Sequence, residues 1–140
     1  MTGRIGQLIL IDDNRADQRI YETVIEKSGL VERWVTFTYA EEALDYFRGP
    51  CELPVNVVLL DVRMPRMNGL EFLQAATEEF GSHFAEVVAV LLTTDLETHD
   101  RARIESFEAV RHLLVKPLTQ DHLQQVAVTL AALRVGRSHN

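Results

Sequence analysis

Five short apolar runs alternate with five helical patterns along this chain, and this alternation leaves few folds open to it. The first, third and fourth runs are almost wholly apolar, which is typical of central parallel strands with both faces buried, whereas the second run alternates and so predicts an edge strand. Strand–helix repeats with right-handed crossovers place helices on both faces of a parallel sheet. We therefore predict a three-layer α/β fold of the doubly wound (βα)5 type. The predicted strands are residues 7–11, 34–38, 55–60, 87–92 and 112–115.

The segments between the runs carry apolar residues at helical spacing. Ala40, Ala43 and Phe47, for example, follow the spacing of an amphipathic helix. Gly29 is a typical helix-ending residue after the first of these segments. The fourth segment is polar around most of its circumference, which indicates either a loosely packed helix or a solvated face. The predicted helices are residues 16–28, 40–47, 72–80, 96–107 and 120–135.

The length and the net charge of the chain limit the classes of protein to which it can belong. With 140 residues and no linker or repeat, we expect a single domain over residues 1–140. The net charge of −7 disfavours binding to nucleic acid or to an anionic membrane, because both need a basic surface. The single cysteine, Cys51, suits a reducing compartment, and no apolar stretch approaches the ~20 residues that span a bilayer. We expect a soluble, cytoplasmic protein.

Polar side chains follow four of the predicted strands, at the carboxyl edge of the sheet. Asp12 and Asp13 follow the first strand and Asp61 the third, while Thr93 and Lys116 follow the fourth and fifth. Ligand sites in open parallel sheets lie at this edge. Three carboxylates brought together cannot all stay ionised without a compensating cation, and Mg²⁺ prefers such oxygen ligands. The sequence thus predicts a magnesium site flanked by a lysine and a hydroxyl.

Asp61 is the candidate for covalent chemistry at this site. A carboxylate can attack phosphorus and form an aspartyl phosphate. Mg²⁺ and Lys116 would neutralise charge on the transferred phosphoryl group, which is most of what this catalysis requires. The alternative is that Asp61 only caps a helix or a loop. That alternative leaves the matching polar residues at the other strand ends unexplained.

Four stretches, LILIDDN, LLDVRMPRMNGLEFL, VLLTTD and LLVKPL, carry a family resemblance in this order. Together they resemble the receiver domain of two-component response regulators over about residues 7–133. The resemblance implies the flavodoxin-like strand order 2-1-3-4-5 and a stand-alone protein, similar to single-domain chemotaxis regulators, with no output domain. It also implies a phosphoacceptor that assists its own phosphorylation and dephosphorylation rather than an enzyme. The phosphoryl donor would be a sensor histidine kinase or a histidine phosphotransfer protein.

The same resemblance implies roles for individual residues. Asp61 would be the phosphoacceptor, and Asp12 and Asp13 the acidic pair that holds Mg²⁺ together with it. The backbone carbonyl of Arg63 would complete the metal site. Phosphorylation would then switch partner binding or pass the phosphate onward.

Further positions of the family pattern surround the acceptor. Thr93 would be the switching hydroxyl and Lys116 the phosphate-binding lysine, with a cis bond between Lys116 and Pro117. Gly69 would permit a tight entry into the third helix. Many receivers carry Tyr or Phe three residues before the lysine, where this chain has Leu113. The resemblance therefore implies hydroxyl switching but not aromatic switching.

Two other classes of function stay open at this point. Aspartate-dependent phosphohydrolases of similar topology usually carry a second acid two residues after the nucleophile, where this chain has Arg63. A degenerate receiver-fold binding module would lack acceptor-site residues, whereas all of them are present. Both alternatives are therefore disfavoured.

A finer hypothesis concerns the lifetime of the phosphoryl group. Arg63 stands two residues after Asp61, and Asp95 stands two residues after Thr93. In the receiver arrangement both side chains flank the opening through which water approaches. Their opposite charges could pair and gate that opening, or both could point into solvent and gate nothing.

The last predicted helix carries two apolar stripes, one more than a single core contact requires. Exposed apolar patches often mark interfaces, so we predict that the second stripe serves a homodimer or a partner surface. The alternative is that small apolar residues are simply tolerated there. The core stripe is Leu123, Val126, Ala127, Leu130 and Leu133, and the second stripe is Val128, Ala131, Ala132 and Val135.

Overall fold

The structure, a computed structural model, describes residues 4–50, 54–92 and 98–138. Its strands are β1 (Ile5–Ile11), β2 (Val31–Phe37), β3 (Val57–Asp61), β4 (Val87–Leu92) and β5 (Val110–Val115). Its helices are α1 (Arg15–Ser28), α2 (Ala40–Arg48), α3 (Gly69–Phe80), α4 (Thr98–Glu105) and α5 (Gln120–Ser138). The strands form one parallel sheet in the order β2-β1-β3-β4-β5, which confirms the predicted fold and strand order.

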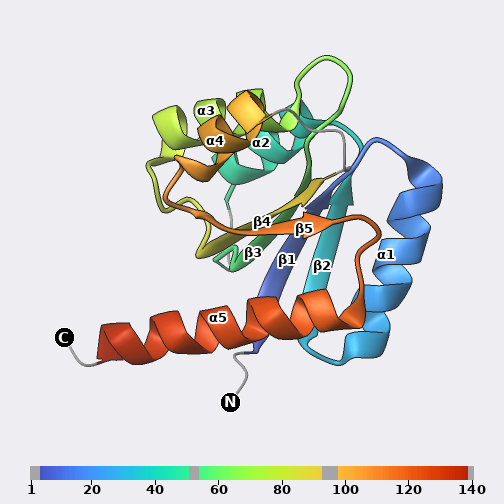
Figure 1. Ribbon diagram of the computed structural model, residues 1–140, viewed down its shortest axis with the longest axis vertical. Helices are drawn as coiled ribbons and strands as arrows, with labels where there is room; N and C mark the ends of the chain where they lie inside the picture. Colours follow the sequence, from blue (N-terminus) through green and yellow to red (C-terminus); the bar gives the residue numbers. More distant parts are fainter. Residues whose placement is uncertain (1–3, 51–53, 93–97, 139–140) are drawn as a thin grey trace.

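Helices cover both faces of this sheet and make three layers. Figure 1 shows α2, α3 and α4 on one face and α1 and α5 on the other. Side chains alternate between the faces along each strand, so β1 contributes to two cores. Ile9 and Ile11 belong to the cluster beneath α2, α3 and α4, whereas Leu8 and Leu10 belong to the cluster beneath α1 and α5. β1, β3 and β4 are central strands, as their continuous apolar runs predicted.

Four strands begin at other residues than predicted. The central strand β1 begins at Ile5, ahead of the predicted residue 7, and β3 begins at Val57, after the predicted residue 55. β2 begins at Val31, ahead of the predicted start at residue 34, and β5 begins at Val110, ahead of residue 112. Glu32 and Arg33 of β2 are exposed and interrupt the apolar run on which the prediction rested. An edge strand has fewer neighbours that cover it, so charged side chains are tolerated there and the hydrophobic pattern understates its length.

Local capping sets where the helices begin and end. The Asn14 side chain accepts a hydrogen bond from the Asp17 N–H and so caps α1. Gly29 closes the same helix at a φ of 68°, as predicted. α4 ends before the predicted residue 107, because the chain turns at Ser106, whose hydroxyl donates to the carbonyl of Arg103.

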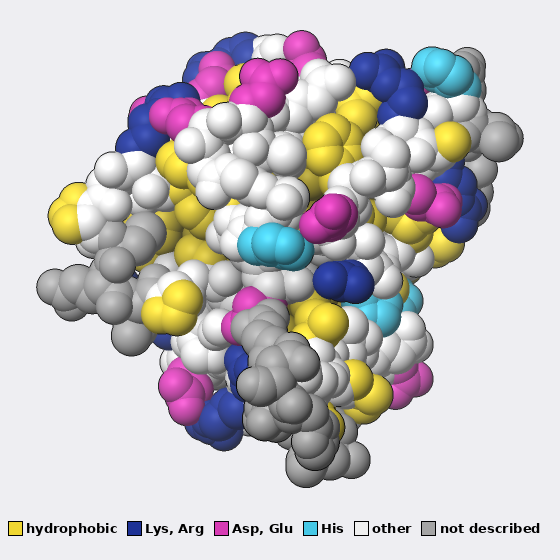
Figure 2. All heavy atoms as spheres, turned by 90° about the vertical axis from the view of Figure 1, so that its left-hand side faces the viewer, with side chains coloured by type: hydrophobic (Ala, Val, Ile, Leu, Met, Phe, Trp, Pro, Cys, Tyr) yellow, Lys and Arg dark blue, Asp and Glu magenta, His cyan; other side chains and the backbone are white. Residues whose placement is uncertain are grey.

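The surface of the described residues is mixed in charge. Figure 2 shows acidic and basic side chains interspersed on one face, with hydrophobic side chains in small, separate groups. The described residues on that face thus form no continuous basic patch. Among the described helices, none combines the length and apolarity that a membrane span requires.

Candidate functional site

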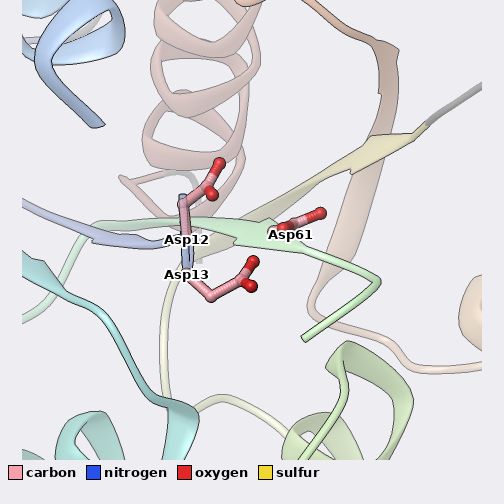
Figure 3. Close-up of side chains that lie close together, drawn as sticks. All are labelled: Asp12, Asp13 and Asp61. Carbon is pink, nitrogen blue, oxygen red and sulfur yellow. The ribbon is translucent and has the colours of Figure 1, made fainter. Parts of the chain in front are cut away.

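Three carboxylates converge at the carboxyl edge of the sheet. Asp12 and Asp13 directly follow β1, and Asp61 is the last residue of β3, the neighbouring strand. One oxygen of each carboxylate lies within 4.8 Å of the others. Figure 3 shows the three side chains pointing to the same side of the strand ends. The predicted convergence of these three residues is therefore confirmed.

Burial makes the charged state of two of these carboxylates costly. Asp12 is 0% exposed and Asp61 is 5% exposed. Burial raises the pKa of Asp61 to about 6, and the charge of Asp12 adds to this effect. Burial also raises the pKa of Asp12, although a hydrogen bond from the Asn14 N–H (2.9 Å) opposes the shift. The site therefore concentrates negative charge where it is poorly solvated, which is typical of functional sites.

Lys116 brings a positive charge into the cluster from the end of β5. Its Nζ lies 3.1 Å from Asp61 Oδ1 and 3.6 Å from Asp12 Oδ2. Burial by itself lowers the pKa of Lys116, but the carboxylates of Asp61 and Asp12 outweigh it and raise that pKa. The Lys116 N–H donates to the carbonyl of Leu92, and the peptide bond to Pro117 is cis, as the resemblance implied. The ammonium group is thus held charged beside Asp61.

A fourth carboxylate, which the sequence did not single out, belongs to α1. Asp17 Oδ2 lies 3.8 Å from Lys116 Nζ. From the sequence Asp17 is an ordinary acidic residue in a first helical turn, where it stabilises the helix dipole. The adjacent Gln18 donates from Nε2 to the carbonyl of Asp12 (2.5 Å) and to Thr38 Oγ1 (3.2 Å). The start of α1 therefore holds the end of β1 in place.

The loop that follows Asp61 is closed tightly at its base. The Gly69 N–H donates to the carbonyl of Val62 over 2.8 Å, and the Arg63 N–H donates to Asp61 Oδ1 over 3.4 Å. A Cβ atom on Gly69 would lie only 2.8 Å from the carbonyl oxygen of Asp61. Glycine is therefore needed where the resemblance implied it, because α3 begins in direct contact with the backbone of Asp61.

The structure describes only some of the other residues to which the sequence analysis gave a role. Thr93 and Asp95 lie outside the described residues, so the switching hydroxyl and the gating pair stay predictions. Leu113 is half-buried on β5 and packs against the cluster beneath α2, α3 and α4. An aliphatic side chain thus occupies the position where the family resemblance would have an aromatic ring.

The donor set fits a hard divalent cation such as Mg²⁺. Asp12 Oδ2 is buried and has no hydrogen-bond partner among the described residues. Three carboxylates against one nearby ammonium leave an excess of negative charge that a divalent ion would balance. Asp12, Asp13 and Asp61 are the residues that would hold it, with the carbonyl of Arg63 as the further predicted ligand.

Comparison with known proteins agrees with this geometry. Residues 8–128 match the response regulator receiver domain family. The chain belongs to the response regulator receiver family. The strand-end aspartates and the lysine described above are the residues to which the resemblance gave roles in phosphoryl transfer.

Receiver domains with a similar sequence occur in proteins of different length. The probable methanogenesis regulatory protein FilR2 of Methanothrix harundinacea is 30% identical over 122 residues, which cover 84% of this chain and 76% of FilR2. The sensory/regulatory protein RpfC of Xanthomonas campestris pv. campestris is 27% identical over 128 residues, which cover 91% of this chain but 17% of RpfC. The shared region is therefore the receiver domain.

A solved structure shows the same arrangement of elements. The two component response regulator from Cytophaga hutchinsonii has a TM-score of 0.83 and 22% sequence identity. The match covers 92% of this chain and 98% of that one. At this level of identity the likeness bears on the receiver fold alone.

Proposed function

We propose that this receiver domain accepts a phosphoryl group on Asp61 from a sensor histidine kinase or a histidine phosphotransfer protein, in the cytoplasm and with Mg²⁺ as cofactor. The observation that carries the proposal is the position of Lys116 Nζ, 3.1 Å from Asp61 Oδ1, within a cluster of three carboxylates. A carboxylate between a fixed cation and two further acids is arranged for phosphoryl transfer.

The chain's own residues supply most of the chemistry. An Asp61 oxygen forms the new O–P bond while the N–P bond of the phosphohistidine breaks, and the imidazole leaves with that electron pair. At neutral pH, above a pKa of about 6, Asp61 is mostly the nucleophilic carboxylate. Lys116 is close enough to Asp61 to pair with a phosphoryl oxygen there. Bound Mg²⁺ would neutralise the remaining charge of the phosphoryl group.

The output of this reaction is a change in the domain rather than a released product. We therefore class the protein as a phosphoacceptor and not as an enzyme, acting as a switch or as a relay that passes the phosphate on. The net charge of −7 favours protein partners over nucleic acid or membranes.

For assembly we propose a homodimer or a partner contact through α5. The core stripe of α5 is buried except for the half-buried Leu133, whereas Val128 and Val135 of the second stripe are 50% and 46% exposed. Two half-exposed valines on one helix suit a contact of small area. Light scattering on the wild type and on Val128→Glu, each with and without a phosphoryl mimic, measures this; a wild-type monomer in both states contradicts the dimer.

Phosphorylation by acetyl phosphate tests the central proposal. In the presence of Mg²⁺ the wild type should gain one phosphoryl group by intact-protein mass spectrometry. Asp61→Asn or EDTA should prevent this, because the first removes the nucleophile and the second removes the cation. Asp45→Asn, which changes an exposed acid of α2, is the matched control and should be labelled like the wild type. Labelling of the Asp61→Asn variant at the wild-type rate would contradict the assignment.

A further inference from the structure

The loop between β3 and α3 has an unusual backbone at its tip. Arg66 adopts a φ of 69°, the only non-glycine residue with positive φ among the described residues. The Met67 N–H donates to the carbonyl of Pro65 over 2.8 Å, so Arg66 is the central residue of a γ-turn. A γ-turn with positive φ at its centre is rare and strained. Such a conformation persists only where surrounding contacts hold it.

The Arg66 side chain makes contacts that can hold the turn. Its Nε donates to Glu41 Oε2 over 2.9 Å, and its guanidinium carbon lies 4.1 Å from the centre of the Tyr39 ring. Tyr39 is the N-cap residue of α2, and Glu41 lies in the first turn of that helix. The other oxygen, Glu41 Oε1, has no hydrogen-bond partner among the described residues. Arg66 thus links the loop tip to the start of α2 by an ion pair and a cation–π contact.

The loop held in this way forms part of the functional site. Its base is fixed by the hydrogen bond from Gly69 to Val62, and the segment between carries Arg63, the predicted carbonyl ligand. Together with Asp100 of α4, this segment lines a surface pocket of about 450 Å³ beside the acceptor strand. The backbone hydrogen bonds at the base of the loop do not fix the γ-turn around Arg66 at its tip. Met64 is buried and Met67 packs against the cluster beneath α2, α3 and α4, whereas the Arg66 side chain makes the polar contacts that join the tip to the start of α2.

We propose that Arg66 is a positioning residue for phosphoryl transfer: it holds the β3–α3 loop against Tyr39 and Glu41 so that the metal-binding side of the loop is ordered before the cation arrives. This inference rests on the function proposed above and names a further residue for it. Arg66 touches none of the reacting groups. It acts by lowering the cost of ordering the loop, which is the physical meaning of preorganisation.

Mg²⁺ binding in the absence of any phosphodonor is the first test. Calorimetric titration of Arg66→Ala with Mg²⁺ should give a dissociation constant about fivefold weaker than that of the wild type, which corresponds to ~1 kcal/mol. The matched control is Arg48→Ala. Arg48 is similarly exposed (48% of its side chain against 55% for Arg66) and links α2 to Glu79 of α3, but it does not contact the loop. It should leave Mg²⁺ binding unchanged.

Phosphorylation kinetics separate positioning from general damage. At limiting Mg²⁺ the Arg66→Ala variant should react with acetyl phosphate about fivefold more slowly, whereas saturating Mg²⁺ should restore the wild-type rate, because only the cost of ordering has changed. Arg66→Asn tests whether the backbone conformation alone, without the side-chain contacts, positions the loop. Asparagine tolerates positive φ but cannot reach Glu41. It should behave like Arg66→Ala. A wild-type result for Arg66→Asn would show that the side-chain contacts do not matter and would overturn the proposal.

A double variant tests whether the contacts act as one unit. Glu41→Gln should weaken Mg²⁺ binding in the same direction as Arg66→Ala, and the double variant should be no weaker than Arg66→Ala alone. Equal Mg²⁺ affinity in wild type, Arg66→Ala and Glu41→Gln would overturn the inference while leaving phosphorylation of Asp61 intact. If instead the wild type takes up no phosphoryl group at all, the proposed function itself fails. Thermal unfolding of each variant verifies that the compared proteins are folded.

Discussion

Polar side chains are buried at both ends of the sheet, at the amino edge where the strands begin and at the carboxyl edge where they end. The two edges differ in whether the buried charges balance one another. At the amino edge Asn56 Oδ1 accepts hydrogen bonds from the N–H groups of Gly6 and Gln7, each 2.9 Å long. Its Nδ2 donates to Glu86 Oε1 over 2.7 Å, and the guanidinium of Arg134 of α5 lies 3.6 Å from the same oxygen. At this edge a neutral amide contacts an acid that lies near a base, so each charged group faces one of opposite sign, and these contacts join the starts of β1, β3 and β4 to α5.

At the carboxyl edge the polar groups are not balanced in this way. Asp12, Asp13 and Asp61 face one another, and Lys116 is shared among carboxylates. The contacts at the amino edge therefore balance charge, whereas the carboxyl edge holds an excess of negative charge that a cation would balance. Polar burial alone does not mark a functional site; unbalanced charge does.

The largest expected effect on cation binding distinguishes the two edges. Asp13→Asn removes the negative charge of a predicted metal ligand and should weaken the affinity for Mg²⁺ by roughly 100-fold. Glu86→Gln, which removes an acid from the amino edge, should leave it unchanged. Calorimetric titration of both variants with Mg²⁺ measures the difference. A similar loss of affinity in both would mean that general charge, and not the strand-end cluster, attracts the cation.

A single substitution should give the amino edge the electrostatics of the carboxyl edge. Asn56→Asp keeps the acceptor for Gly6 and Gln7 but places a second carboxylate against Glu86, where a 2.7 Å hydrogen bond now exists. We expect a loss of ~3 kcal/mol in the free energy of unfolding at pH 7, because a buried charge then lacks its partner. Urea unfolding measures this loss.

The pH dependence of that variant sharpens the test. The new carboxyl group would have a raised pKa in the folded state, so stability should return as the pH falls and the group is protonated. Adding Glu86→Gln should recover part of the loss at pH 7. An unchanged stability of Asn56→Asp would show that the amino edge tolerates unbalanced charge as well as the carboxyl edge does.

The raised pKa of Asp61 predicts a pH-dependent contribution of the carboxyl edge to stability. Its pKa is about 6 when folded, against an ordinary value of 3.8, so the folded state binds the proton more tightly. Stability should therefore fall as the pH rises from about 4 to about 6 and change no further above that range, by an amount on the order of 2–3 kcal/mol.

Urea unfolding of the wild type and of Asp61→Asn at pH 4.5 and 7.5 measures the contribution of Asp61 to the free energy of unfolding. Asp61→Asn should show a smaller decrease, because Asp12, whose pKa is also raised, still contributes, and it should be more stable than the wild type at pH 7.5 without Mg²⁺. Saturating Mg²⁺ should narrow that gap, because it stabilises the wild-type carboxylate cluster. Equal pH profiles for wild type and Asp61→Asn would contradict the argument.

The smallest effect concerns the predicted gate at the carboxyl edge. Arg63→Ala and Asp95→Ala should each shorten the lifetime of the aspartyl phosphate by about threefold, since a weak surface pair is worth only ~0–1 kcal/mol. The double variant should lose phosphate no faster than the quicker single variant. Decay of the phosphorylated protein by mass spectrometry provides the lifetimes. Strictly additive effects, or none, would show that the two residues do not act together.

Several features of the fold and the site followed from local pattern. The apolar runs of β1, β3 and β4 predicted central strands, and Gly29 predicted the end of α1. The edge strands were predicted too short, because exposed residues such as Glu32 interrupt the hydrophobic pattern. Hydrophobic periodicity reports burial, so it identified the central strands but not all of their ends: β1 begins at Ile5, ahead of the predicted residue 7.

The meeting of Asp12, Asp13, Asp61 and Lys116 was determined by the sequence alone, because parallel strands present their carboxyl ends at one edge and each residue stands at such an end. The contacts of Asp17 with Lys116 and of Arg66 with Glu41 came only from the three-dimensional arrangement. Both join a strand end or loop to a helix, and no periodic rule relates those positions. The pairing of parallel strands aligns their ends, so the positions of residues at those ends follow from the sequence. The approach of a helix to a loop depends instead on how the intervening side chains pack.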